Sequence, residues 1–442
     1  MACSFVRSSF VRGSTVRHYA AVAALQPSAT TALESEVLSN NITVATCDNN
    51  SPIAQVSIVF RAGSRNETYE TQGVAHHLRI AAGLSTSGCT GFAITRNIQQ
   101  IGANLIATVD RESIAYTLQI TRNNLSNALK FLEEVATKQV FKPWELSDQV
   151  PRLQYELSSL PETVRVLELL HKTAFRNGLG YSLYSPKHQL GKINPETLQH
   201  FVNTWFTGPK CAVVATGVSL PELSAFASNL NIGSQNNAIE ASRYYGGEVR
   251  KERASDLANV AVAVEGVSLK NEKEALACAI LQRASGTGPR VKWGYSPSPL
   301  YKQVLSVAGT DPFALSTLNA SYSDSGLFGF VLCSAPNIAG PLTIAACKWL
   351  RSLKLSDTDI ARGKAILKAE ILDAADNITT VLESLQQQAL NGEVSSPASL
   401  ISNVDKLSAS TLNSVASKLV KGNLTMAAMG NLKTVPHMNE LK

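Results

Sequence analysis

Residues 192–198 read Lys192-Ile193-Asn194-Pro195-Glu196-Thr197-Leu198, and residues 406–412 repeat them with substitutions as Lys406-Leu407-Ser408-Ala409-Ser410-Thr411-Leu412. Thr411 lies 214 positions after Thr197, and the apolar residues that follow both copies keep the same offset. Each copy then leads into a short apolar stretch that ends at glycine, at residues 211–217 and 424–430. Self-similarity at so long a period indicates one folding unit that is present twice.

The repeated unit has the pattern of a helix followed by a strand. Asn194 and Ser408 occupy N-cap positions ahead of apolar residues at helical spacing. Other segments alternate with period two, as strands do, or follow helical spacing. The expected strands are 113–120, 260–264 and 328–332, and the expected helices are 125–136 and 272–282. We therefore expect an α+β fold of two similar halves, each an antiparallel-rich sheet packed with helices.

The repeat also predicts the domain organisation. The N-terminal domain is expected to cover residues 38–232 and the C-terminal domain residues 251–442. The segment between them, 233–250, begins with Gly233-Ser234-Gln235-Asn236-Asn237 and is polar enough to be a linker.

Residues 1–19 have the composition of a mitochondrial transit peptide. They contain three arginines and four serines, and no carboxylate occurs before Glu34. A positively charged leader is drawn towards a matrix that is electrically negative, which explains why acids are excluded. Arg17 precedes a candidate processing site between Tyr19 and Ala20. The alternative is a disordered basic tail.

Composition excludes several classes of protein. No run approaches the 18 to 20 apolar residues, roughly, that cross a bilayer. The seven cysteines include no Cys-x-x-Cys pair, so we expect reduced, buried thiols and neither a structural zinc site nor a disulfide framework. The net charge of +6 is small, and the arginines of the leader supply three of those charges, which disfavours nucleic acid as a partner.

Four ordered motifs resemble those of the mitochondrial processing peptidase and pitrilysin family, over roughly residues 40–435. They are Gly63-Ser64-Arg65-Asn66-Glu67, Gly73-Val74-Ala75-His76-His77-Leu78-Arg79-Ile80, Gly102-Ala103-Asn104-Leu105-Ile106-Ala107-Thr108 and Ala320-Ser321-Tyr322-Ser323-Asp324-Ser325-Gly326-Leu327-Phe328-Gly329. The resemblance implies a duplicated metallopeptidase-like fold.

Active members of this family carry His-x-x-Glu-His on a helix, where two histidines bind zinc and the glutamate is the general base. His76 matches the first histidine, but Arg79 replaces the glutamate and Ile80 replaces the second histidine. Isoleucine has no lone pair to donate, and a protonated arginine cannot accept a proton from water. The resemblance thus implies a degenerate zinc motif, with no catalytic residue, no metal site and no bound cofactor.

The third zinc ligand of the family is a glutamate some seventy to eighty residues further along the chain. Glu156 and Glu162 lie in that region, but alignment backward from His171 places Val164 at the expected position. We therefore interpret both glutamates as solvated carboxylates, and His76 as a packed or exposed residue of its helix. No ligand role is assigned to the other histidines nearby, which are His77, His171 and His188.

Among inactive relatives, the chain resembles the core subunits of mitochondrial ubiquinol-cytochrome c reductase, respiratory complex III. The non-catalytic subunit of the presequence-processing peptidase carries a long glycine-rich loop, whereas residues 284–290 contain only two glycines. Of the two core-subunit types, the chain resembles the one that has lost the whole zinc motif, with further likeness at residues 298–301 and 319–330. A subunit of the matrix processing peptidase stays as the alternative.

This resemblance implies a structural role in the respiratory chain, in support of electron transport. The expected location is the matrix side of the mitochondrial inner membrane, as a peripheral subunit. The expected partners are core protein 1, cytochrome b, cytochrome c1 and the Rieske iron-sulfur protein, within a homodimeric parent complex. The family's two-half shape also allows a residual cavity that holds a cleaved presequence.

Overall fold

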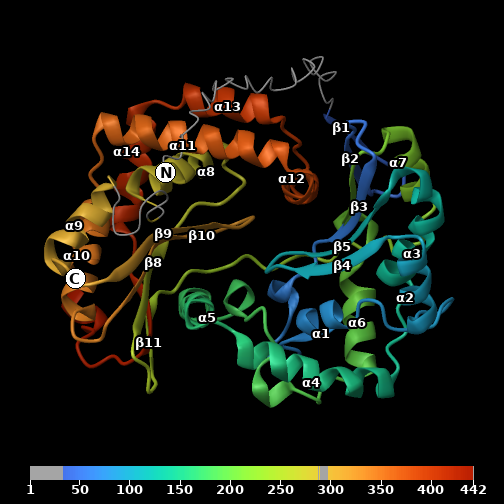
Figure 1. Cartoon of the computed structure of the whole chain (residues 1–442), viewed down its shortest axis with the longest axis horizontal. Helices are drawn as coiled ribbons and strands as arrows, with labels where there is room; N and C mark the ends of the chain where they lie inside the picture. The colour runs from blue at the N-terminus through green and yellow to red at the C-terminus, as the bar shows by residue number, and fades with distance from the viewer. Residues whose placement is uncertain (1–32, 287, 289–296, 442) are drawn as a thin grey trace, which may run out of the picture.

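The computed structural model describes residues 33–286, 288 and 297–441. The expected transit peptide, with Arg17, Tyr19 and Ala20, lies outside the described residues, as does part of the glycine-poor stretch 284–290. Two mixed β-sheets, one from each half of the chain, face each other across the molecule and carry helices on their outer sides (Figure 1). The expected α+β class is confirmed.

The first sheet has six strands in the order β1-β2-β6-β3-β5-β4. Its strands are β1 (Leu33–Val37), β2 (Thr43–Cys47), β3 (Ile53–Phe60), β4 (Asn104–Val109), β5 (Ile114–Thr121) and β6 (Cys211–Thr216). The second sheet has five strands in the order β7-β11-β8-β10-β9. Its strands are β7 (Gly247–Glu252), β8 (Ala258–Glu265), β9 (Phe313–Ser321), β10 (Gly326–Ser334) and β11 (Thr425–Gly430).

The two sheets have the same topology once β1 is set aside. The last strand of each half, β6 or β11, pairs in parallel with β2 or β7 on one side. On its other side it pairs antiparallel with β3 or β8, and two further antiparallel pairings complete each sheet. The duplication that the repeated segment predicts is therefore confirmed.

Helices that cover the outer face of each sheet come from the same half as that sheet. In the N-terminal half these layers contain α1 (Val74–Ile80), α2 (Gly91–Gln100), α3 (Leu125–Thr137), α4 (Pro143–Ser159), α6 (Pro195–Trp205) and α7 (Leu220–Ser228). In the C-terminal half they contain α8 (Glu272–Ser285), α9 (Pro299–Ala308), α10 (Ala339–Ser352), α11 (Asp357–Asp376), α13 (Pro397–Lys406) and α14 (Ala409–Lys421). None of the helices in the described residues is both long and apolar enough to cross a bilayer.

The repeated segment forms α6 and α14, as expected, although the two helices begin differently. The Ser408 hydroxyl accepts the backbone N–H of Thr411 at 3.3 Å and so caps α14. Asn194 is at the N-cap position of α6, but its side chain makes no cap hydrogen bond, and Pro195 with its fixed φ opens the helix instead.

Two helices are exchanged between the halves. Helix α5 (Glu162–Phe175) belongs to the N-terminal half but packs on β8 and β11, whereas α12 (Ile378–Asn391) belongs to the C-terminal half but packs on β2, β3 and β6. Both lie between the two sheets in Figure 1. Each sheet therefore buries its inner face against a helix of the other half.

Small side chains make this exchange possible. Along β8 the valines point to the outer core, whereas Ala261 and Ala263 face the cluster that contains α5. In the other half, Ala45 and Ala212 face the cluster that contains α12. Alanines let a helix backbone approach the sheet closely, and larger side chains on the opposite face fill the thicker outer core.

We expect Ala263→Leu to lower the free energy of unfolding by about 1–3 kcal/mol, because extra methyl groups overpack a well-filled interface. Denaturant titration of the purified chain measures this change. Ala314→Leu is the matched control, since Ala314 is exposed on strand β9, and it should cost less than about 0.5 kcal/mol. Equal effects of the two substitutions would contradict close packing at Ala263.

Ionic contacts join the halves at a second place. Arg65, whose side chain is 4% exposed, lies 2.6 Å from the carboxylate of Glu112 and also pairs with Asp324 of the C-terminal half. The backbone N–H of Ser323 donates to Glu112 at 2.9 Å. Two motifs that carried the family resemblance, residues 63–67 and 320–329, thus meet in space through their charged side chains.

Candidate functional site

Helix α1 carries the degenerate motif, and a buried glutamate fixes its start. The two carboxylate oxygens of Glu67 accept the backbone N–H groups of Gly73 and Ala75, each at 2.8 Å. This places a carboxylate at the positive end of the helix dipole. Burial raises the pKa of Glu67 to about 8, against the two N–H donors that lower it. Gly73 has a φ of 95°, and a Cβ there would stand 2.5 Å from the side chain of Ser185.

His76 is the residue of the motif that the interior holds most firmly. Its side chain is only 1% exposed, and its Nδ1 accepts the backbone N–H of Ser185 at 3.1 Å. The proton of the neutral ring therefore lies on Nε2, which donates to the carboxylate of Glu156 at 3.0 Å. Burial lowers the pKa of His76 to about 4, and the nearby charge of Arg79 adds to this, whereas the Glu156 carboxylate opposes it.

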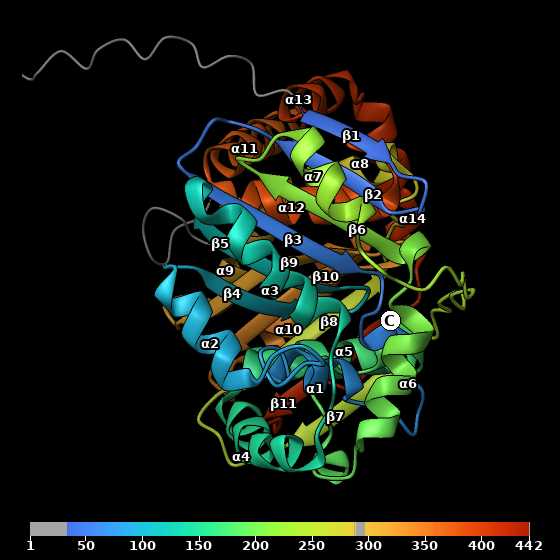
Figure 2. The same cartoon turned by 90° about the vertical axis from the view of Figure 1, so that its right-hand side faces the viewer.

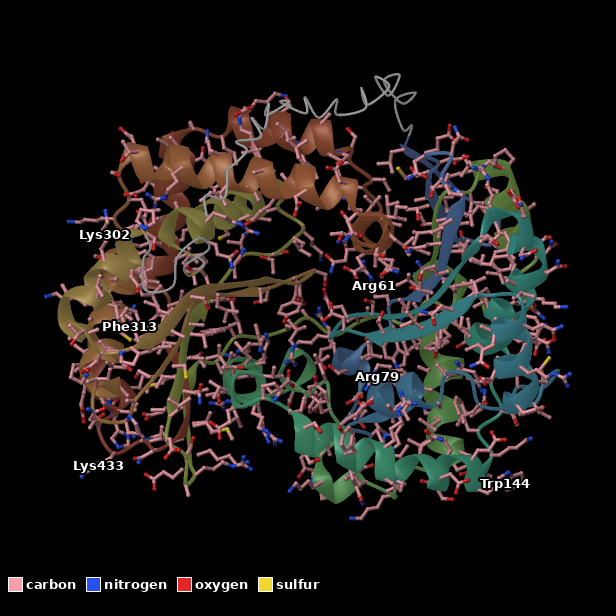
Figure 3. All side chains as sticks on the ribbon, viewed as in Figure 1. Arg61, Arg79, Trp144, Lys302, Phe313 and Lys433 are labelled. Atoms are coloured by element: carbon pink, nitrogen blue, oxygen red, sulfur yellow. The ribbon has the colours of Figure 1, made fainter. Side chains whose placement is uncertain are left out.

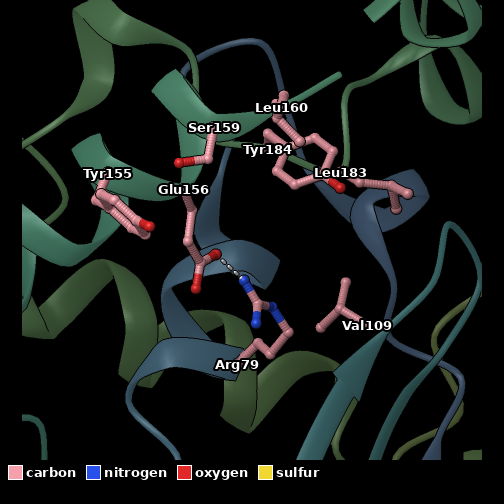
Figure 4. Close-up of a pocket in the computed structure, with 8 residues that line it drawn as sticks. All are labelled: Arg79, Val109, Tyr155, Glu156, Ser159, Leu160, Leu183 and Tyr184. Atoms are coloured by element: carbon pink, nitrogen blue, oxygen red, sulfur yellow. Dashed lines mark hydrogen bonds and ion pairs between the residues drawn. The ribbon is translucent and has the colours of Figure 1, made fainter. Parts of the chain in front are cut away.

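Glu156, on α4, is part of this site, which corrects the expectation of a solvated carboxylate. Its side chain is 24% exposed and forms an ion pair with Arg79 as well as the hydrogen bond to His76. Partial burial works to raise the pKa of Glu156, but the hydrogen bond from His76 and the charge of Arg79 outweigh it and lower the pKa. Figure 4 shows the Arg79 guanidinium directed at the Glu156 carboxylate.

Four residues decide whether this site fits zinc. His76 Nε2 and the nearer Glu156 oxygen are 3.0 Å apart, close to the separation of about 3.3 Å between two ligands of one tetrahedral zinc ion. Arg79, however, brings its guanidinium to that carboxylate, and Ile80, on the same face of α1 as His76, is apolar and 2% exposed. The residues therefore do not fit the metal, because a fixed organic cation pairs with the carboxylate and one ligand is missing.

The arrangement also lacks a base for hydrolysis. The carboxylate of Glu156 is engaged by Arg79 and His76, and the His76 ring has both nitrogens in hydrogen bonds. Within the described ranges, no three side chains of His, Cys, Asp or Glu gather as a metal site would need. What remains is an ion pair and a hydrogen bond that connect α1 to α4.

A cavity of about 360 Å³ opens beside this ion pair. It is lined by Arg79, Val109, Tyr155, Glu156, Ser159, Leu160, Leu183 and Tyr184 (Figure 4). The Tyr184 ring stands edge-on to the His76 ring, with 5.6 Å between the ring centres. Tyrosine and leucine side chains thus line much of the cavity, and the opposite charges of Arg79 and Glu156 beside them neutralise each other.

The other residues considered from the sequence have contacts of their own. Glu162, expected to be solvated, accepts a hydrogen bond from the Asn259 side chain at 3.0 Å and so links α5 to the second sheet. His77 is 7% exposed, and its Nδ1 lies 2.8 Å from the carbonyl oxygen of Gly73. His171 is buried, and burial, with the charge of Arg111, lowers its pKa to about 3. The exposed His188 lies elsewhere, on the rim of another cavity.

Sequence reasoning missed Glu156 although one signal pointed to it. Glu156 lies 80 positions after His76, inside the interval in which the family places its third ligand. Alignment backward from His171 led instead to Val164. The part played by Ser185 had no sequence signal, because only its backbone N–H contacts His76.

Acid should destabilise the fold through His76. Its pKa is about 4 in the folded chain and about 6.5 when unfolded, so the unfolded state binds the extra proton between these values. The stabilisation is complete above about pH 6.5 and should fall by about 2 kcal/mol between about pH 6.5 and about pH 5. Unfolding titrations at both pH values measure this loss.

His76→Gln is the variant that isolates this effect. It should be less stable than the natural chain near pH 7 but should lose about 2 kcal/mol less on acidification. Glu67, whose raised pKa changes stability with pH in the opposite direction, is present in both chains. Its contribution therefore cancels when the natural chain and His76→Gln are compared. His188→Gln, at an exposed position, should leave the pH dependence unchanged. An identical acid response in the natural chain and His76→Gln would contradict the assignment.

Comparison with known proteins gives two family matches. Residues 43–187 match the family described as Insulinase (Peptidase family M16), and residues 192–367 match the Peptidase M16 inactive domain. The family resemblance read from the motifs is confirmed. The two matches follow one another along the chain, and the second begins ahead of β6, which belongs to the first sheet.

Individual relatives cover nearly the whole chain. A Homo sapiens protein, cytochrome b-c1 complex subunit 2, mitochondrial, is 35% identical over 92% of this chain and 92% of its own length. An Arabidopsis thaliana protein, probable mitochondrial-processing peptidase subunit alpha-1, is 27% identical over 91% of this chain and 83% of its own length. Among solved structures, a chain of complex III2 from Candida albicans has the same fold, with a TM-score of 0.78, 20% identity, and coverage of 93% of this chain and 99% of that chain.

Proposed function

Because this chain belongs to the M16 peptidase family, we propose that it is a non-catalytic core subunit, core protein 2, of mitochondrial ubiquinol-cytochrome c reductase. In this role it supports assembly and stability of respiratory complex III for electron transfer from ubiquinol to cytochrome c. The observation that carries the proposal is the similarity to human cytochrome b-c1 complex subunit 2, which extends over 92% of both chains.

The degenerate site supports a role without catalysis. Peptide hydrolysis on this scaffold needs a base and a second histidine on α1, and the chain has Arg79 and Ile80 in those positions. The ion pair between Arg79 and Glu156 instead holds α1 to α4. A former metal site has become a structural contact.

We propose the same domain organisation and surroundings as the sequence predicts. The peptidase-like domains cover residues 38–232 and 251–442 with a linker at 233–250, the last four residues of which already belong to β7. Residues 1–19 act as a transit peptide that is cut between Tyr19 and Ala20. The subunit lies peripherally on the matrix side of the inner membrane. Its partners are core protein 1, cytochrome b, cytochrome c1 and the Rieske iron-sulfur protein.

The alternative is a subunit of the matrix presequence-processing peptidase. Similarity to the Arabidopsis thaliana processing-peptidase subunit supports this alternative, but at 27% identity against 35% for the complex III relative. The alternative also needs a partner that supplies the entire catalytic centre.

Fractionation of mitochondria distinguishes the two functions. Membranes from cells that carry an epitope-tagged full-length chain are extracted with mild detergent and run on a blue-native gel. The tagged chain should comigrate with cytochrome b, and its depletion should reduce ubiquinol-cytochrome c reductase activity. Comigration with presequence-cleaving activity, in fractions free of cytochrome b, would overturn the proposal in favour of the alternative.

A further inference from the structure

A second cavity lies between α5, the segment 176–188 and the end of β7. Its volume is about 540 Å³, within the range of about 300–1,000 Å³ in which proteins bind small ligands. Figure 2 shows α4, α5, β7 and β11 gathered in the same lower part of the molecule. Both halves contribute to the cavity, since α5 belongs to the first half, and Lys251, Arg253 and Met429 to the second.

The lining of this cavity is strongly basic. The cationic side chains are Arg165, Lys172, Arg176, Lys187, Lys251 and Arg253. Of the described residues that line it, Glu168 alone has a carboxylate, and that carboxylate is already engaged by Arg111 and by the backbone N–H of Leu183 at 3.0 Å. We call this site the basic cavity.

Neighbouring carboxylates do not cancel these positive charges. The Nε of Arg165 donates to the backbone carbonyl of Leu160 at 3.1 Å, and the guanidinium of Arg176 lies 4.6 Å from the centre of the Tyr245 ring. The four remaining cations form no ion pair with any carboxylate in the described part of the chain. Several like charges around one cavity repel one another, and an anion in the cavity would relieve that repulsion.

The cations are arranged in rows and do not converge on one point. Arg165 and Lys172 lie seven positions apart on one face of α5, about 10 Å at about 1.5 Å per residue, and Arg176 is the non-helical residue that follows the end of the helix. Lys251 and Arg253 are alternate residues of an extended segment and so lie on the same face. A row of about 10 Å matches about three residues of an extended polypeptide at about 3.3 Å each.

Apolar and aromatic groups lie among the cations. Leu157, Leu169, Met429 and Tyr181 line the same cavity, and the rim carries Tyr69, whose side chain is 75% exposed. A ligand with alternating carboxylates and apolar side chains would satisfy both kinds of surface. Extended chains present side chains on alternate faces, as such a ligand needs.

We propose that the basic cavity binds an extended, acidic peptide segment of a partner protein. A single phosphate or lipid head group would engage only part of the α5 row, whereas several carboxylates along a strand reach the whole row. The same charges repel a presequence, because presequences are rich in arginine and lack acids. This inference does not rest on the proposed place in complex III.

The test measures binding of a fluorescein-labelled peptide of about eight residues, which alternates glutamate with leucine. Fluorescence anisotropy is recorded with the purified full-length chain and with Lys172→Glu/Lys251→Glu. The double variant should bind the peptide about tenfold more weakly, because two attractions become repulsions, each of them weakened by the exposure of the lysine to solvent. Binding to the natural chain should also weaken as salt is added.

Lys302→Glu/Lys348→Glu is the matched control. Lys302, labelled in Figure 3, and Lys348 are exposed on helices α9 and α10 and line none of the cavities described above. This variant makes the same change in net charge and should bind the peptide like the natural chain. Circular dichroism and thermal unfolding establish that both double variants are folded.

Two further probes exclude other ligands. A peptide with lysine in place of glutamate should not bind, and vesicles that contain an anionic phospholipid should bind the natural chain no better than Lys172→Glu/Lys251→Glu. Equal affinity of the two double variants for the acidic peptide would overturn the proposal. The proposal would also be overturned if the natural chain bound the vesicles through Lys172 and Lys251 but did not bind the acidic peptide.

Discussion

Replacement of Arg65 by methionine is expected to lower the free energy of unfolding by about 3 kcal/mol. The guanidinium of Arg65 is almost wholly buried and pairs with carboxylates from both halves, Glu112 and Asp324. Methionine fills part of the space but leaves two carboxylates close together without a cation. Removal of one partner from a buried ionic cluster costs more than the cluster contributes, because the remaining charges stay desolvated.

Denaturant titration measures this effect, and Arg122→Met is its matched control. Arg122 pairs with Asp48 at 2.8 Å, but these side chains are 34% and 26% exposed. Exposed pairs contribute little, so the control should cost less than about 1 kcal/mol. If Arg65→Met and Arg122→Met prove equally costly, the contact between the halves does not have the strength inferred for it.

Restoration of the zinc motif should have the second large effect. In Arg79→Glu/Ile80→His, the guanidinium is removed and the missing ligand and base are supplied. His76 and Glu156 already lie 3.0 Å apart, so three ligands would converge from α1 and α4. We expect this double variant to retain about one zinc ion per chain after dialysis, and the natural chain to retain none.

Elemental analysis by mass spectrometry measures the metal, and thermal unfolding with and without zinc measures the coupling to stability. Ile80→His alone keeps the guanidinium of Arg79 beside Glu156 and should not bind zinc. A folded double variant that binds no zinc would show that α1 and α4 no longer hold the geometry of a metal site. Zinc bound to the natural chain would contradict the account of Arg79.

The duplication could be predicted from the sequence because it depends on local patterns. The copies at residues 192–198 and 406–412, with the strands that follow them, are short-range signals, and the topology of both sheets agrees with them. The exchange of α5 and α12 could not be predicted in this way. Helical spacing shows that a helix has an apolar face but not which sheet covers it.

At the site too, residue identities could be read from the sequence, whereas contacts between helices could not. The chemistry of Arg79 and Ile80 follows from their identities, so the loss of the metal motif was visible in the sequence. The partner of Arg79 was not visible, because Glu156 comes from another helix and is one of the two glutamates considered as the third ligand. Only the packing of α4 against α1 decides between Glu156 and Glu162.

The traded helices bear on the history of the chain. A single ancestral unit of this design would leave the alanine-rich inner surface of its sheet bare to water. Two identical copies could cover both surfaces if each packed one of its helices on the sheet of the other, as in domain-swapped dimers. The present polypeptide is then such a dimer fused end to end, and cleavage between β6 and β7 would not liberate two self-sufficient modules.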